Sequence, residues 1–221
     1  MKAWPIYVDL QNRVAYGDGI ATPDSHNVNA AIACEYLDRV RAERPLASGL
    51  IVGPGGPSEV ASFRGHVDRL TAMTMHAPEY EAMFAQRSGA VVCMGDMHDM
   101  PFQAGVFDVV YAANVLEHAL APYCALIEVR RVMVAGGIGY FVMPSFAGRD
   151  GGRSPFHLHC LDQKVWTELL RKVGLPVASV EDVVGGADPD HTYVHYRCIA
   201  GEVTRPFDAL MNEITTLRAT P

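Results

Sequence analysis

Hydrophobic positions along this chain fall into short continuous runs that are separated by segments with helical spacing. Apolar runs bounded by turn-forming residues predict strands at 48–53, 68–75, 90–94, 107–113 and 137–143. Helical patterns lie between these runs at 57–65, 78–87 and 119–134. Continuous apolar runs that alternate with helices indicate a parallel sheet covered on both faces, because each such strand is buried on both sides.

Further elements are predicted on either side of this alternating block. Helical patterns occupy residues 25–43 and 161–173. Two β-rich runs, 177–184 and 192–199, are joined by the turn-forming segment 185–190 and predict a terminal hairpin. The pattern by itself supports a doubly wound α/β domain.

The domain organisation follows from the length and the absence of internal boundaries. The chain has 221 residues, which suffice for one sizeable α/β domain and are too few for two ordinary ones. No repeat, low-complexity segment or linker divides it. We expect residues 1–45 to form an N-terminal arm and a helix that packs on the domain, and residues 46–221 to form the domain itself.

Composition narrows the class of function. Hydrophobic residues make up 49% of the chain and charged residues 19%, which allows a packed core. The net charge of −7 argues against general binding of DNA or RNA, because that requires a basic surface facing the phosphates. A small-molecule substrate is therefore the expected partner, and the sequence leaves an oligomer possible.

The expected location is cytoplasmic, with no membrane association. The N-terminal residues contain no apolar signal core, and the longest apolar run, 132–144, is shorter than the roughly 20 residues that span a bilayer. Five scattered cysteines without a CxxC pair suggest a reducing compartment and no disulfide framework.

The segment Gly95–His118 carries the most specific motif: GDMHDMPFQAGVFDVVYAANVLEH. It combines a Gly-Asp loop, a Met-Pro-Phe turn, a buried strand and an Asn-Val-Leu-Glu-His helix start. At this spacing it resembles the second half of the cofactor site in class I S-adenosylmethionine-dependent methyltransferases, in particular the small-molecule branch. The resemblance extends over roughly residues 46–183. It implies a Rossmann-like fold with a mostly parallel seven-stranded sheet and a C-terminal antiparallel hairpin, and S-adenosyl-L-methionine as cofactor.

This resemblance assigns roles to three residues of the motif. It implies that Asp96 binds the adenine amino group, that the backbone of Met97 meets the adenine ring, and that Asn114 touches the methionine part of the cofactor. A second interpretation of Asp96, as the cap of a helix or turn, stays open. The Arg-rich turn with Gly136 and Gly137 resembles the family's reversal from helix to strand and is evidence for the fold only.

The first half of the implied cofactor site departs from the family pattern. Gly53 and Gly55 match the first two glycines of the family's D/E-x-G-x-G-x-G loop, and Gly56 follows them. Pro57 stands in place of the third glycine and Ile51 in place of the acid. A purely structural turn between strand and helix would show the same residues.

The ribose-binding acid of the family is also missing. The second strand is followed by Ala77-Pro78-Glu79, which fixes the alignment and places Met75, or Thr74 one residue earlier, where the acid would be. Hydrogen bonds to charged groups are worth about 1.5–3 kcal/mol each, so their loss weakens cofactor binding by roughly 10–100-fold. Glu59, His76 or the N-terminal arm could offset this loss.

Histidines near the implied site are the candidates for acceptor chemistry. We consider His118 and His159 as catalytic residues, and His157 and Arg153 as substrate-binding residues. A zinc site built from His118, His157, His159 and Cys160 is conceivable, but the spacing is not diagnostic and we expect no metal. His195 lies inside the last predicted strand and is expected to pack in the core.

Two classes of function remain open. The first is methyl transfer to a small molecule by in-line displacement, in which catalysis comes mainly from positioning. The second is a methyltransferase-fold protein without that activity, acting as a binding or partner subunit or with a repurposed site. The missing acids at Ile51 and Met75 favour the second class, and the intact adenine half favours the first.

Overall fold

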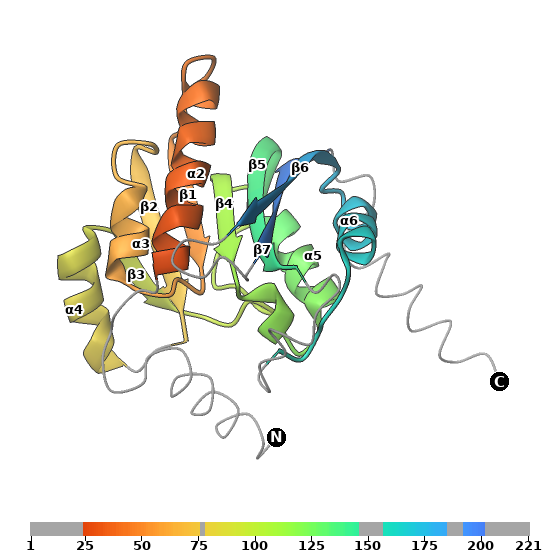
Figure 1. Cartoon of the computed structure of the whole chain (residues 1–221). Coiled ribbons are helices and arrows are strands. Elements are labelled where there is room, and N and C mark those ends of the chain that lie inside the picture. Colours follow the sequence, from red (N-terminus) through yellow and green to blue (C-terminus); the bar gives the residue numbers. More distant parts are fainter. Residues whose placement is uncertain (1–23, 76–77, 146–156, 185–191, 202–221) are drawn as a thin grey trace.

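A single twisted sheet organises the chain (Figure 1), and the computed structural model describes residues 24–75, 78–145, 157–184 and 192–201 of it. The strands are β1 (Ser48–Val52), β2 (Arg69–Thr74), β3 (Val91–Met94), β4 (Phe107–Ala113), β5 (Met133–Pro144), β6 (Val177–Val184) and β7 (Thr192–Ile199). The sheet has seven strands in the order β3-β2-β1-β4-β5-β7-β6. Of these, β1 to β5 run parallel, and β7 is antiparallel to both of its neighbours. The predicted doubly wound sheet with a C-terminal antiparallel hairpin is confirmed.

Helices cover both faces of this sheet. They are α2 (Asp24–Arg41), α3 (Pro57–Ser62), α4 (Pro78–Ser88), α5 (Pro122–Val132), α6 (Gln163–Lys172) and the 3-10 helix η1 (Leu116–His118). Apolar side chains of α2, α3 and α4 enter one buried cluster, and those of α5 and α6 enter a second cluster on the opposite face. No helix in the described ranges is long and apolar enough to cross a bilayer.

The central strand β4 shows why its sequence is almost entirely apolar. Val110 and Ala112 face the cluster beneath α5 and α6, whereas Val109 and Tyr111 face the cluster beneath α2, α3 and α4. All four side chains are at most 2% exposed. Because successive residues of a strand point to opposite faces, a strand buried on both faces needs apolar residues at every position.

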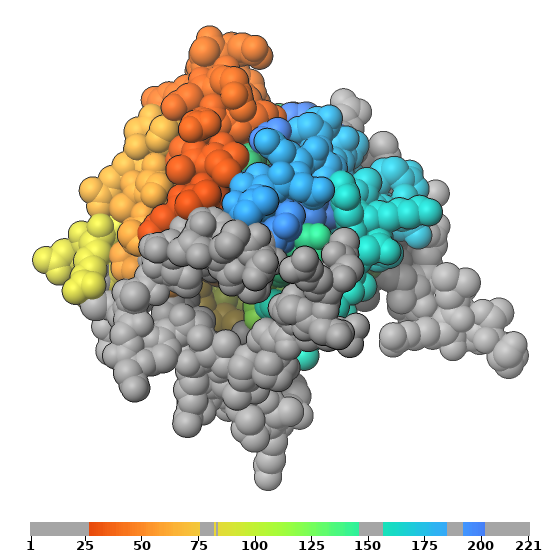
Figure 2. All heavy atoms as spheres, viewed as in Figure 1, coloured from red at the N-terminus to blue at the C-terminus, as the bar shows by residue number. Residues whose placement is uncertain are grey.

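Helix α2 packs on the domain, as expected for the end of the N-terminal region. Ala33 and Leu37 are fully buried in the cluster that also holds Leu46. The helix also reaches the C-terminal strands, because the guanidinium of Arg197 in β7 lies 5.3 Å from the centre of the Tyr36 ring. In Figure 2 the orange surface of α2 meets the blue surface of these strands, although the two segments are far apart in the sequence.

The start of β5 differs from the prediction. Strand β5 begins at Met133, directly after α5, rather than beyond a glycine reversal. Phe107 pairs with Met133 and Val109 with Ile138, so residues 134–137 bulge out of the ladder. Gly136 takes φ 73°, and its N–H donates to the Ala200 carbonyl at 2.8 Å. The glycines thus permit a bulge inside the strand.

The predicted helix 119–134 is shorter in the structure. Helix α5 begins only at Pro122 and ends at Val132, and the separate η1 at Leu116–His118 precedes it. Proline is suited to the first helical position because its fixed φ matches the helix and its missing N–H would have no helical partner there.

His195 joins β7 to α2 through buried hydrogen bonds, and its predicted packing role is confirmed. The ring is fully buried. Its Nδ1 lies 2.8 Å from the Tyr140 hydroxyl, and its Nε2 lies 3.1 Å from Oδ1 of Asn29. Nε2 therefore donates to Asn29, and Nδ1 accepts from Tyr140. Burial, with a smaller contribution from Arg197, lowers the pKa of His195 from 6.5 to about 4.

This lowered pKa makes the fold sensitive to acid. Between pH 6.5 and 4 this histidine binds a proton in the unfolded chain but not in the folded protein, where it is buried. The stability that is present above pH 6.5 is therefore lost as the pH falls through this range. The pKa shift corresponds to a loss of about 3 kcal/mol at most. Urea unfolding of the wild type and of His195→Gln at pH 7 and pH 4.5 measures it. The wild type should lose more stability than the variant over this range, and equal losses would contradict the assignment.

Candidate functional site

The candidate site lies where the carboxyl ends of β1, β3 and β4 meet. Strand β1 lies between β2 and β4 in the sheet. From β1 the chain adds β2 and β3 on one side, and it then returns to add β4 and β5 on the other side. Loops that leave β1 and β4 therefore separate towards opposite faces, and such a switch point is where open α/β sheets bind ligands. The predicted cofactor residues Gly53–Gly56, Asp96 and Asn114 all follow these strand ends.

Gly53 turns the chain at the end of β1 in a conformation that favours glycine. Its φ is 60°, and its N–H donates to the Met73 carbonyl of β2 at 2.8 Å. A Cβ at this position would lie 2.4 Å from Cγ2 of Val115, which follows β4. The turns after β1 and β4 therefore touch at the place where only a residue without a side chain fits.

The loop after Gly53 is stabilised by Glu59, an acid to which the family resemblance assigns no role. The Gly55 N–H donates to Oε2 of Glu59 at 2.6 Å, and Glu59 is only 1% exposed. Gly56 caps α3 with an extended backbone, and Pro57 is the first residue of that helix. Pro57 therefore serves as a helix start in place of the third glycine. The sequence signal for Glu59 was an acid in the first turn of a helix that begins with proline.

Asp96 closes a turn and keeps part of its carboxylate exposed. Its Oδ1 accepts from the backbone N–H of His98 at 2.9 Å and lies 2.6 Å from Nδ1 of the same ring. Nε2 of His98 accepts from the Ala121 N–H at 3.2 Å, so Nδ1 carries the proton and donates to Asp96. The Asp96 side chain is 34% exposed, and these bonds use only Oδ1. The turn-capping interpretation is confirmed, and it leaves Oδ2 out of these bonds.

The other predicted cofactor residues differ in what they can offer. The Met97 side chain is 6% exposed and belongs to the core, so only its backbone can meet a ligand. Asn114 has φ 51°, and its N–H donates to the Val142 carbonyl at 2.9 Å. Met75 follows the end of β2 and is half-buried, whereas Thr74 before it is buried. The end of β2 therefore presents no carboxylate at either position.

The structure brings two of the predicted histidines together with a buried acid. The rings of His118 and His157 are 4.9 Å apart between centres, in an edge-to-face arrangement at 68°. Glu117 lies beside them, with its Oε1 4.0 Å from Nε2 of His118. His159 contributes through its backbone, because its N–H donates to the Glu117 carbonyl at 3.0 Å. Arg153 lies outside the described residues.

Glu117 is the residue of this group that sequence reasoning missed. Its side chain is fully buried, and neither carboxylate oxygen has a hydrogen-bond partner among the described residues. Burial raises the pKa of Glu117 to about 8. In the sequence it stands out only as the neighbour of His118 at a helix start, and nothing in the pattern indicates that its side chain points inward.

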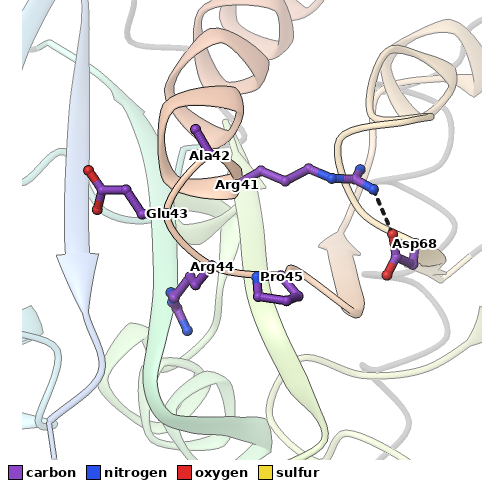
Figure 3. A pocket seen from close by; sticks show the side chains of 6 residues that line it. All are labelled: Arg41, Ala42, Glu43, Arg44, Pro45 and Asp68. Atoms are coloured by element: carbon purple, nitrogen blue, oxygen red, sulfur yellow. Dashed lines mark hydrogen bonds and ion pairs between the residues drawn. The ribbon is translucent and has the colours of Figure 1, made fainter.

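A separate hollow lies at the opposite end of the sheet (Figure 3). It is lined by Arg41, Ala42, Glu43, Arg44, Pro45 and Asp68. Arg41 pairs with Asp68 at 2.7 Å, and Arg44 donates to the Gly136 carbonyl at 2.7 Å. Since these segments precede β1 and β2, the hollow is remote from the switch point, and its arginines tie loops together.

Comparison with known proteins identifies the class to which this geometry belongs. Residues 50–141 match the family model described as a methyltransferase domain. The structure of 1,6-didemethyltoxoflavin-N1-methyltransferase from Burkholderia thailandensis, with bound 1,6-didemethyltoxoflavin and S-adenosylhomocysteine, has a TM-score of 0.70 at 20% identity, covering 91% of this chain and 89% of that chain. The N-methyltransferase NodS from Bradyrhizobium japonicum, in complex with S-adenosyl-L-homocysteine, has a TM-score of 0.65 at 18% identity, covering 89% of this chain and 98% of that chain.

A sequence relative is known from Streptomyces fradiae. The uncharacterized 37.1 kDa protein in transposon TN4556 is 28% identical over 132 residues, which is 58% of this chain. The chain covers only 38% of that protein's length.

Residues 50–141 thus match a methyltransferase domain, and the chain has the fold of the class I S-adenosylmethionine-dependent methyltransferases. The resemblance stated from the sequence is confirmed, and the predicted cofactor, S-adenosylmethionine, is the one that defines this class.

Gly53→Ala tests the close contact between the turns after β1 and β4. The variant must place a Cβ against Val115 and also hold φ 60°, so we expect a loss of about 2–4 kcal/mol in the free energy of unfolding. Gly105→Ala is the matched control, because φ is 67° there and nothing lies within 4 Å of the added Cβ. Urea unfolding should show a loss of about 1 kcal/mol for the control. Equal losses in both variants would show that the contact with Val115 is unimportant.

Proposed function

We propose that this protein transfers a methyl group from S-adenosyl-L-methionine to a small molecule at the carboxyl edge of its sheet. One observation carries the proposal: the glycine turn after β1 contacts the turn after β4, and the partly exposed carboxylate of Asp96 follows β3 at the same edge of the sheet. The match of residues 50–141 to a methyltransferase domain supports the same activity.

The residues present suit two of the three parts of the cofactor. Oδ2 of Asp96 and the backbone of Met97 would hold the adenine, and the bonds of Asp96 to His98 keep the carboxylate in place. Gly53, Gly56 and Asn114 would surround the methionine part, where two left-handed residues bring bare backbone close to the ligand. The ribose would lack its acid, since Met75 cannot accept a hydrogen bond from a hydroxyl as a carboxylate does.

The cofactor supplies an activated methyl group on a sulfonium, so the protein's task is to place the acceptor atom in line and keep water away. Such positioning can contribute up to about 7–11 kcal/mol. The acceptor would lie beside His118 and His157, which extend the site beyond the end of β4. His159, predicted as catalytic, would act by holding this segment against η1 through its backbone. Arg153 remains a proposed contact for an anionic group of the substrate.

Two observations support a small molecule as the methyl acceptor: the negative net charge of the chain and the name of one structural relative. A net charge of −7 disfavours a nucleic-acid substrate. The Burkholderia enzyme is, by its name, a methyltransferase of 1,6-didemethyltoxoflavin, and its structure contains that molecule.

The alternative is a methyltransferase-fold protein that does not bind the cofactor. Two observations favour it: the carboxyl end of β2 has Met75 in place of the acid, and the Gly55 N–H is already bonded to Glu59. Cofactor binding separates the two functions directly, because the alternative requires that none occurs.

Calorimetric titration with S-adenosylmethionine or S-adenosylhomocysteine tests the proposal. We expect a dissociation constant below about 1 mM, since one missing acid costs roughly 10–100-fold and the adenine half is intact. A folded protein that gives no binding heat in this range would favour the alternative function.

Asp96→Asn tests the adenine contact without opening the turn. An asparagine Oδ1 can still accept from the His98 N–H, but the other atom becomes an amide donor facing the adenine amino group. We expect binding to weaken by at least about tenfold, which corresponds to about 1.4 kcal/mol. His98→Gln is the control, because it changes the turn while keeping the carboxylate. Equal affinity of Asp96→Asn and the wild type would remove Asp96 from the cofactor site.

A further inference from the structure

Glu117, His118 and His157 converge next to the proposed acceptor position, and we infer that they bind a divalent transition-metal ion of the zinc type. Their ligand atoms, one carboxylate oxygen and two imidazole nitrogens, lie within 4.8 Å of one another. Two histidines and one carboxylate are a donor set that zinc sites use. The spacing of these residues in the sequence is not diagnostic of a metal site, and no metal was expected from it; the fold brings the residues together.

The distances allow the site to close with small movements. In a tetrahedral site with bonds of about 2.0–2.2 Å, ligand atoms lie roughly 3.3 Å apart. Oε1 of Glu117 and Nε2 of His118 are 4.0 Å apart, and all three ligand atoms lie within 4.8 Å of one another. Rotamer shifts of about 1 Å are therefore enough, and they are easiest for His157, which precedes α6 on a loop segment.

Glu117 provides the second, independent observation. Both of its carboxylate oxygens are buried without a hydrogen bond among the described residues. Two other acids are buried in the part of the chain that the structure describes, and each accepts hydrogen bonds: Glu59 from Gly55, and Glu128 from Met100 and Arg131. A buried carboxyl without a partner costs free energy that an apolar residue would avoid. A cation bound between Glu117 and the histidines provides the missing partner.

The backbone holds the two parts of the site together. The His159 N–H donates to the carbonyl of Glu117 at 3.0 Å, which fixes the segment carrying His157 against η1. Three residues later, Asp162 caps α6 by accepting from the Val165 N–H at 2.8 Å. Both contacts lie just after His157 in the chain, and they limit how far it can move from Glu117 and His118.

Three protein ligands leave one position of a tetrahedral ion open, which is the arrangement of catalytic rather than structural zinc sites. The open position would take an oxygen or nitrogen of the acceptor molecule and favour its deprotonated form. This last role depends on the proposed methyl transfer, whereas the metal site itself depends only on the cluster.

The experiment is a metal titration of tag-free, chelator-dialysed protein without added cofactor. Co²⁺ should bind in a 1:1 ratio with the strong visible absorption of a four-coordinate ion, and Zn²⁺ should displace it. Glu117→Gln, His118→Asn and His157→Asn should each weaken Zn²⁺ binding by at least about 100-fold, because loss of an outer partner alone costs about 10–100-fold. His157→Asn changes only a loop side chain and gives a result even where the buried Glu117→Gln variant fails to fold.

Two matched controls separate this site from adventitious binding. His159→Asn removes a nearby imidazole outside the cluster while keeping its backbone bond, and His66→Asn removes the surface pair that His66 forms with Asp38. Both should retain wild-type affinity for Zn²⁺. Absence of binding up to about 1 mM, binding that survives His157→Asn, or binding lost in His66→Asn would each overturn the inference. None of these outcomes depends on S-adenosylmethionine, so they leave methyl transfer to its own test.

Discussion

Contact between the turns that leave β1 and β4 is the constraint on which the candidate site depends. The sheet grows in opposite directions from these two strands, so their loops diverge at the carboxyl edge. At the strand ends a Cβ on Gly53 would meet the side chain of Val115, and Gly53 and Asn114, which follow β1 and β4, both have a left-handed backbone. Gly53 and Asn114, the predicted contacts for the methionine part of the cofactor, lie at this junction.

Acidic groups in the site stand where their local environment can stabilise them. Glu59 supports the glycine loop from the first turn of α3, where a helix N-terminus favours negative charge. Asp96 is fixed by a hydrogen-bonded turn that leaves it partly exposed. The carboxyl end of β2 has only Met75, so the proposed ribose contact lacks a carboxylate, whereas the proposed adenine contact has Asp96. Glu117 is the exception, since its buried carboxylate accepts no hydrogen bond from the described residues.

Most of the fold could be predicted from the sequence, because the spacing of apolar residues reflects which side chains each helix or strand buries. The strands β4, β6 and β7 begin and end at the residues that the apolar runs predicted. The errors arose where backbone geometry overrides the pattern. Gly136 makes a bulge inside β5 rather than a turn before it, because β5 pairs with Phe107 from its first residue. Pro122 delays the start of α5 because proline has no N–H to continue an earlier helix.

The sequence by itself determined the class of the protein, since periodic burial and the motif from Gly95 to His118 depend on neighbours along the chain. The tertiary structure decided which side chains share a site. His157 and His159 have the same residue type and nearly the same position, yet His157 faces His118 while His159 contributes its backbone. Glu117 became a candidate ligand only because η1 turns it inward beside both rings. Such contacts join residues distant in sequence, and their distances depend on how loops pack against the sheet, which no local pattern records.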